Sequence, residues 1–126
     1  MRLIIIEESF VEGLPSWLGT REKKRFQAKL QKGEKITVVE YQVTLGEARK
    51  LVPIVCERLL PSRYYAHVAE KDHLLVMFHG CAFCLSRGDQ RTINLCRSVG
   101  NQIGIPNEEL QFEAMFDQDH PDLAHE

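Results

Sequence analysis

The segment His79–Cys84, HGCAFC in one-letter code, contains the residue types in this chain that most readily perform chemistry. Two thiols three residues apart, with an imidazole two residues before the first, could bind a metal, form a redox pair, or act as a nucleophile with its base. The same residues could also lie in a buried strand, where cysteine serves as a small apolar side chain. The elements around the segment decide between these interpretations.

A long β-like run over residues 74–85 predicts that HGCAFC lies within one strand. Side chains on a strand alternate between its faces, so Cys81 and Cys84 would point to opposite sides and could not share a metal ion. A bulge at Gly80 is the one feature that could change this register. The remaining cysteines and histidines show no spacing that completes the four ligands of structural zinc. We therefore predict neither a metal site nor a cofactor.

A hairpin places the histidine of this segment beside a tyrosine. A tight turn at Lys71-Asp72 would pair residues 63–70 with 74–85, so that Tyr64 faces His79 and Cys81 follows on the same face. Such a cluster could act as an acid–base or nucleophile–base site, because histidine titrates near neutral pH and can activate a neighbouring thiol. The alternative is that His79 is a hydrogen-bonded core residue next to a buried tyrosine.

A basic segment over residues 21–35 is the second candidate site, with seven basic and two acidic residues. Its leading residues, Arg21, Lys23, Lys24 and Arg25, could bind phosphates, since lysine and arginine supply most non-specific affinity for nucleic acid. However, Phe26 is its only aromatic residue and the whole chain has a formal charge of −2, so no stacking platform for single strands is indicated. A solvated strand edge protected by lysines explains the segment better.

The predicted elements define an α+β fold. Residues 21–35 fit a strand better than a helix, because Phe26, Ala28 and Leu30 alternate with polar residues. A capping box at Thr44–Glu47 and an N-cap at Asp89 begin two helices. The sequence predicts strands over 3–7, 21–31, 36–43, 63–70, 74–85 and 110–116, and helices over 44–60 and 89–103. A turn at residues 32–35 would join the strands over 21–31 and 36–43 in a hairpin.

From about residue 36 the order of elements is βαββαβ, the ferredoxin-like arrangement. It implies an antiparallel sheet with two helices on one face, which the N-terminal strands would extend. We expect residues 1–116 to form a single domain and residues 117–126, which are acidic, to be a disordered tail. Many unrelated functions occur on the ferredoxin-like fold, so the fold does not decide the activity.

Both faces of the predicted hairpin are apolar, whereas two helices on one side would cover only one of them. Alternate residues place Ala66, Val68 and Met77 on one face, and residues such as Val76 and Phe78 on the other. Because a large exposed apolar patch is unusual on a monomer, we predict a homodimer through this sheet face. The N-terminal segment that carries Trp17 is the alternative cover.

Composition sets the remaining expectations. The chain has 126 residues, of which 44% are hydrophobic, and it contains no apolar run approaching the ~20 residues that span a membrane. We therefore expect a cytoplasmic protein with reduced cysteines. The leading functional hypothesis is a dimeric ligand-binding or regulatory module. The alternative is a small cofactor-free enzyme around Tyr64, His79 and Cys81, and binding of an anion or nucleic acid at residues 21–35 has the least support.

Overall fold

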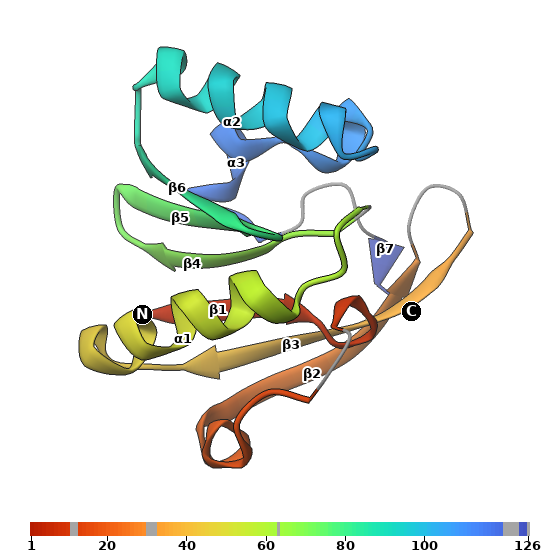
Figure 1. Cartoon of the computed structure of the whole chain (residues 1–126), viewed down its shortest axis with the longest axis vertical. Helices are drawn as coiled ribbons and strands as arrows, with labels where there is room; N and C mark the ends of the chain where they lie inside the picture. Colours follow the sequence, from red (N-terminus) through yellow and green to blue (C-terminus); the bar gives the residue numbers. More distant parts are fainter. Residues whose placement is uncertain (11–12, 30–32, 63, 120–123, 126) are drawn as a thin grey trace.

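A seven-stranded antiparallel sheet organises the chain. The computed structural model describes residues 1–10, 13–29, 33–62, 64–119 and 124–125. Within these residues the strand order is β6-β5-β4-β1-β3-β2-β7 (Figure 1). The strands are β1 (Arg2–Ile6), β2 (Glu22–Lys29), β3 (Lys35–Gln42), β4 (Ala66–Glu70), β5 (His73–Phe78), β6 (Cys81–Ser86) and β7 (Ala124–His125). The helices are α1 (Leu45–Arg58), α2 (Gln90–Gln102) and α3 (Phe112–Met115), with 3-10 turns η1 (Glu7–Ser9), η2 (Ser16–Arg21) and η3 (Asn107–Glu109). The α+β class is confirmed.

Strand β1 occupies the centre of the sheet. It pairs with β3 on one side and with β4 on the other, both antiparallel. Residues Leu3–Ile6 are all buried, because both faces of this strand are covered. The prediction that the N-terminal strands extend the sheet is therefore wrong for β1, whose unbroken apolar run is typical of a strand buried on both faces.

The two predicted hairpins are confirmed. Strands β2 and β3 pair antiparallel, which settles residues 22–29 as strand. Strands β4 and β5 pair in the expected register, with Val68 opposite Leu75 and Ala66 opposite Met77. The turn between them contains Lys71, whose φ of 48° lies in the left-handed region.

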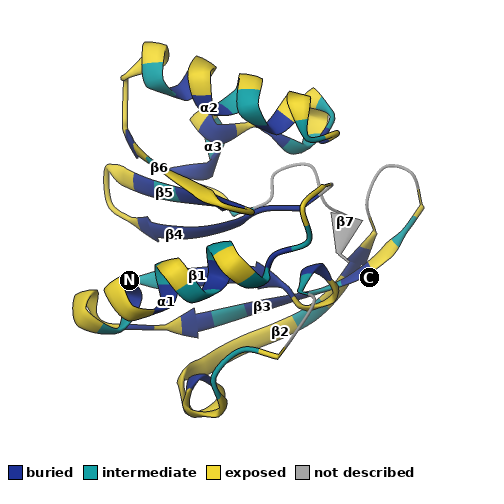
Figure 2. Cartoon of the chain, in the orientation of Figure 1, coloured by how far each residue is buried: buried dark blue, intermediate teal, exposed yellow. Residues whose placement is uncertain are grey.

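Helices α1 and α2 pack on opposite faces of the sheet, contrary to the prediction of two helices on one face. Residues Leu51 and Val55 of α1 belong to the same core cluster as Met77 of β5. The α2 residues Ile93 and Cys96 belong to a second cluster, which contains the alternate β5 residues Val76 and Phe78. Helix α2 accordingly lies on the far side of β4–β6 from α1, and each helix exposes its outer surface (Figures 1 and 2).

The second apolar face of the hairpin is thus covered within the chain, by α2, η3 and α3. The homodimer through a sheet face stays a prediction, but the exposed face that suggested it is filled by residues of the same chain, among them Phe112 and Met115. The segment with Trp17 packs on the other face of the sheet, where Leu18 joins the α1 cluster.

The segment 110–116 forms no strand. Phe112 and Met115 in the short helix α3, and its C-cap Phe116, are buried at helical spacing. The alternation of Phe112, Ala114 and Phe116 suggested a strand, but Phe112 and Phe116 are four apart, a spacing that places residues on one face of a strand or of a helix. The strand order therefore differs from the ferredoxin-like arrangement, since β3 pairs with β1 and β2 and the last predicted strand is absent from the sheet.

The predicted strand 74–85 is two strands joined by a tight turn. Strand β5 ends at Phe78, Gly80 adopts a φ of 82°, and β6 begins at Cys81. A positive φ is readily adopted by glycine and costs other residues energy, so Gly80 is the residue that permits the reversal. The turn was not predicted because most residues on both sides of it are apolar and typical of strands.

The beginning of the acidic C-terminal segment is attached to the domain. Asp117 accepts hydrogen bonds from Arg87, and Asp119 accepts them from Arg2 at 2.5 Å. Asp119 also lies 3.0 Å from Nε2 of His67, which is fully buried in β4. Residues 120–123 and 126 of the predicted tail lie outside the described residues. No helix in the described ranges is long and apolar enough to cross a membrane.

We predict opposite effects of alanine at two glycines. Gly80→Ala should lower the free energy of unfolding by about 1 kcal/mol, because alanine is strained at the positive φ of the turn. Gly46→Ala should raise it by roughly 0.5 kcal/mol, because Gly46 is helical and a methyl group meets nothing closer than Oγ1 of Thr44 at 4.0 Å. Urea denaturation measures both, and equal effects would contradict the turn at Gly80.

Candidate ligand-binding cleft

His79 and Gly80 dock the β5–β6 turn against the C-terminal end of α1. The Nδ1 atom of His79 lies 2.9 Å from the carbonyl oxygen of Leu59, so this nitrogen carries the proton and donates. The backbone N–H of Gly80 donates to the carbonyl of Cys56 at 3.0 Å. His79 therefore satisfies a carbonyl at the end of a helix, which is a structural role.

The other two members of the predicted acid–base cluster have different partners. The hydroxyl of Tyr64 donates to Glu34 Oε1 at 2.8 Å. Cys81 is exposed at the start of the edge strand β6, and its carbonyl accepts a hydrogen bond from Sγ of Cys56 at 3.5 Å. Both Tyr64 and His79 lie beyond the ends of the paired strands. The hydrogen bonds of His79 and Cys81 thus lead to the C-terminal end of α1, whereas that of Tyr64 leads to Glu34 beside β3.

The four cysteines are distributed over both faces of the sheet. Cys81 and Cys84 are exposed and, being three apart in β6, point to opposite faces, as expected for a strand. Burial raises the pKa of the Cys96 thiol to about 12, with a smaller contribution from Cys81. Burial and Cys81 also raise the pKa of Cys56. In the described ranges, no three His, Cys, Asp or Glu side chains are grouped so that they could hold a metal ion.

Two of the four candidate basic residues are already bound to carboxylates. Arg21 forms an ion pair with Glu47 of α1 at 2.8 Å. Arg25 binds Glu22 through two nitrogens, and it binds Glu7 at 2.5 Å. Only Lys23 and Lys24 of the four form no ion pair among the described residues, and the ammonium of Lys24 lies over the ring of Phe26. The charges of Arg21 and Arg25 are therefore neutralised within the chain.

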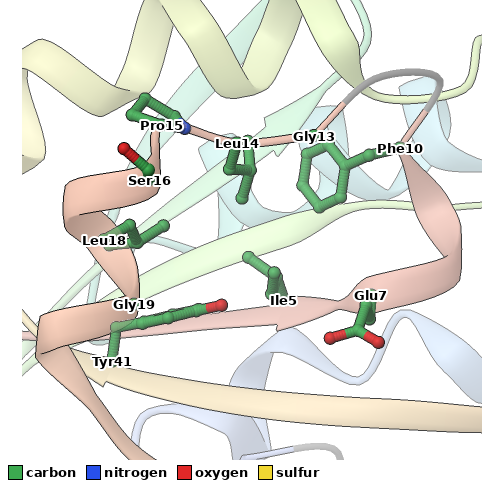
Figure 3. A pocket seen from close by; sticks show the side chains of 10 residues that line it. All are labelled: Ile5, Glu7, Phe10, Gly13, Leu14, Pro15, Ser16, Leu18, Gly19 and Tyr41. Atoms are coloured by element: carbon green, nitrogen blue, oxygen red, sulfur yellow. The ribbon is translucent and has the colours of Figure 1, made fainter.

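The structure contains a cleft that the sequence did not predict. It has a volume of about 470 Å³ and lies between segment 13–19 and the face of β1 and β3 beside α1 (Figure 3). Ile5 and Tyr41 form its floor, and Leu14 points into it from the opposite wall. The described residues that line it are Ile5, Glu7, Phe10, Gly13, Leu14, Pro15, Ser16, Leu18, Gly19 and Tyr41. A volume of this size is typical of sites that bind small molecules.

Helix α1 fixes the upper wall of the cleft at both ends. Near the N-terminal end of α1, Glu47 caps the helix and also pairs with Arg21, which follows the wall segment. Near the C-terminal end, Arg58 donates to the carbonyl of Gly13 at 2.5 Å. Between these points Leu18 is buried in the core. The wall is thus held by contacts to a rigid helix, and the cleft does not require a ligand in order to form.

One end of the cleft is polar. The Tyr41 side chain is buried, and its hydroxyl points toward Glu7 in the cleft (Figure 3). Among the described residues this hydroxyl has no hydrogen-bond partner. Burial raises the pKa of the Tyr41 phenol, the carboxylates of Glu22 and Glu7 raise it further, and Arg25 opposes them. Tyr41 is therefore a neutral hydroxyl at neutral pH and can both donate and accept a hydrogen bond.

Comparison with known proteins assigns no function to this chain. No protein-family model, no curated protein and no solved structure matches it. What can be stated is the class, an α+β protein whose antiparallel sheet carries helices on both faces. Sequence reasoning missed Tyr41 and Glu7 as site residues because they meet only in the folded chain. The sequence feature that could have indicated the cleft is the loop with Gly13, Pro15 and Gly19. Such a loop covers the sheet less completely than a helix would.

The cysteines should react with iodoacetamide in the order of their exposure. We expect Cys81 and Cys84 to be alkylated in the native protein and Cys96 only after unfolding, because Cys96 is buried and its thiol stays protonated. Mass spectrometry of the alkylated peptides measures the order. Alkylation of native Cys96 at the rate of Cys84 would contradict its placement on the buried face of α2.

The raised pKa of Cys96 also predicts how stability depends on pH. Above about pH 9 the unfolded chain releases the Cys96 proton, whereas the folded protein retains it until about pH 12. The unfolded state is then favoured, so the free energy of unfolding falls as the pH rises through this range. Cys96→Ala removes this contribution, and its stability should fall less steeply between about pH 8 and about pH 10. Equal slopes in urea titrations of the two proteins would contradict the assignment.

Proposed function

We propose that this protein binds a small molecule in the cleft between segment 13–19 and strands β1 and β3. The observation that carries the proposal is the preformed cleft itself, with a largely apolar lining and a polar end at Tyr41 and Glu7. Ligand sites in proteins commonly combine an apolar wall with a few placed polar groups. A ligand-binding or regulatory module is thus the favoured function.

The other two functions receive less support from the geometry. An acid–base enzyme at Tyr64, His79 and Cys81 would need these groups to act on one substrate, but the imidazole of His79 is engaged at the end of α1. Binding of an anion at residues 21–35 would depend mainly on its lysines, because Arg21 and Arg25 are paired with carboxylates. Breaking these pairs would oppose the binding of an anion.

The proposal is tested by screening fragments against the ¹⁵N-labelled protein with amide chemical shifts. Fragments that bind should shift the amides of Leu14, of Ser16–Gly19 and of Tyr41. Leu14→Trp should abolish these shifts, because a larger side chain on the wall fills the cleft. Leu95→Trp is the matched control and should preserve them, since Leu95 is exposed on α2, across the sheet.

Two outcomes would contradict the proposal. One is that no fragment shifts the amides that line the cleft. The other is that the fragments bind Leu14→Trp as tightly as they bind the original protein. Amide spectra of each variant without ligand show that it retains the fold, so that a loss of binding is not mistaken for unfolding.

A further inference from the structure

The charges around the cleft point to the kind of ligand that it accepts. Glu7 is the one lining residue in the described part of the chain that carries a charge at neutral pH. Its neighbour Arg25 binds two carboxylates, those of Glu7 and Glu22, so this group of three has a net charge of −1. A ligand with a positive charge would therefore be favoured at this end of the cleft.

The other charged groups near the cleft do not reverse this sign. Arg21 is neutralised by Glu47, and Glu8 contributes a further negative charge while it accepts hydrogen bonds from the amide and hydroxyl of Thr37. The remaining cation, Arg58, reaches the wall from the C-terminal end of α1 and donates to the carbonyl of Gly13. The guanidinium of Arg58 is thus bound to the wall segment, away from the polar end at Glu7 and Tyr41.

Hydrogen-bonding capacity agrees with the charge. Glu7 uses Oε2 to bind Arg25, and among the described residues its Oε1 atom accepts no hydrogen bond. The Tyr41 hydroxyl points toward it across the floor of the cleft (Figure 3). Within the described ranges, the polar end thus offers two oxygen acceptors, and Arg25 beside it is already paired with two carboxylates. An ammonium group, which has three donors and no acceptor, complements this arrangement.

The rest of the lining defines the body of the ligand. Ile5, Phe10, Leu14, Pro15 and Leu18 provide aliphatic and aromatic surface. Half of the Glu7 side chain remains exposed, so the polar end lies at the mouth of the cleft, where a charged group keeps part of its hydration. The body would lie deeper, against the apolar wall.

We propose that the cleft binds a primary ammonium compound with an apolar, aryl or branched alkyl body, whose ammonium group donates to Glu7 and Tyr41. This inference rests on the proposed ligand-binding function and specifies the ligand class. Binding needs no covalent step, because the site contributes only a carboxylate, a hydroxyl and apolar surface.

Three compounds of nearly equal shape test the inference: 2-phenylethylamine, 2-phenylethanol and phenylacetate. The amine is protonated at neutral pH, because alkyl amines titrate near pH ~10. Trp17, the only tryptophan of the chain, lies between the lining residues Ser16 and Leu18 and reports binding by its fluorescence. We expect the amine to bind roughly tenfold more tightly than the alcohol, and phenylacetate to bind least tightly.

Three variants separate the contributions of the polar end. Glu7→Gln should reduce the affinity for the amine by about tenfold and leave that for the alcohol unchanged, because only the amine uses the charge. Tyr41→Phe should weaken the binding of the amine by a smaller factor, since it removes one neutral acceptor. Glu108→Gln makes the same change of charge at an exposed position in η3, which covers the opposite face of the sheet, and should have no effect.

The results distinguish failure of this inference from failure of the proposed function. The ligand class is wrong if phenylacetate binds as tightly as the amine, or if Glu7→Gln leaves the affinity for the amine unchanged. It is also wrong if none of the three compounds binds. In each of these cases the ligand-binding function is judged separately, by whether fragments of other kinds shift the cleft amides and lose binding in Leu14→Trp.

Discussion

The burial of β1 on both faces is the constraint on which the rest of the structure depends. Residues Leu3–Ile6 are each at most 5% exposed, and their side chains alternate between the two faces of the sheet. Because apolar surface on both sides must be kept from water, a sheet with one wet face could not accommodate this strand. The chain therefore needs a cover on each side. On one side the cover consists of α1, η1 and η2. On the other side, Gln118 and Asp119 lie beside Ile4, and α2 covers the neighbouring strands β4–β6.

The cleft follows from the way in which the first of these covers is assembled. Helix α1 packs against β5 and β6, so the part of the same face over β3 is left to η1 and η2. A helix presents a continuous apolar stripe, whereas an irregular segment with Gly13, Pro15 and Gly19 places few large side chains against the sheet. The face is thereby closed to bulk water only in part, and the space that remains lies above Ile5 and Tyr41.

Local signals allowed much of the fold to be predicted from the sequence. The capping box at Thr44 and Glu47, the N-cap at Asp89 and the register of the β4–β5 hairpin depend on residues close together in the chain. The packing of the helices was not predicted correctly. The sequence does not specify on which face of the sheet each helix packs. Placing both helices on one face left the other face apolar and uncovered, which led to the prediction of a second subunit. The cleft is the extreme case, since Glu7, Leu18 and Tyr41 come from three different elements.

The three tyrosines distinguish the cleft from the rest of the fold by the partners of their hydroxyls. Tyr64 and Tyr65 are as well buried as Tyr41, and their hydroxyls donate to Glu34 and to the carbonyl of Glu109. A buried polar group that is left unpaired costs about 1–3 kcal/mol, so folded proteins rarely retain one. Of the three, only the hydroxyl of Tyr41 lacks a protein partner in the described ranges, and it is the one that faces open space. The fold thus satisfies its buried hydroxyls by internal bonds except where a molecule from outside can complete the bonding.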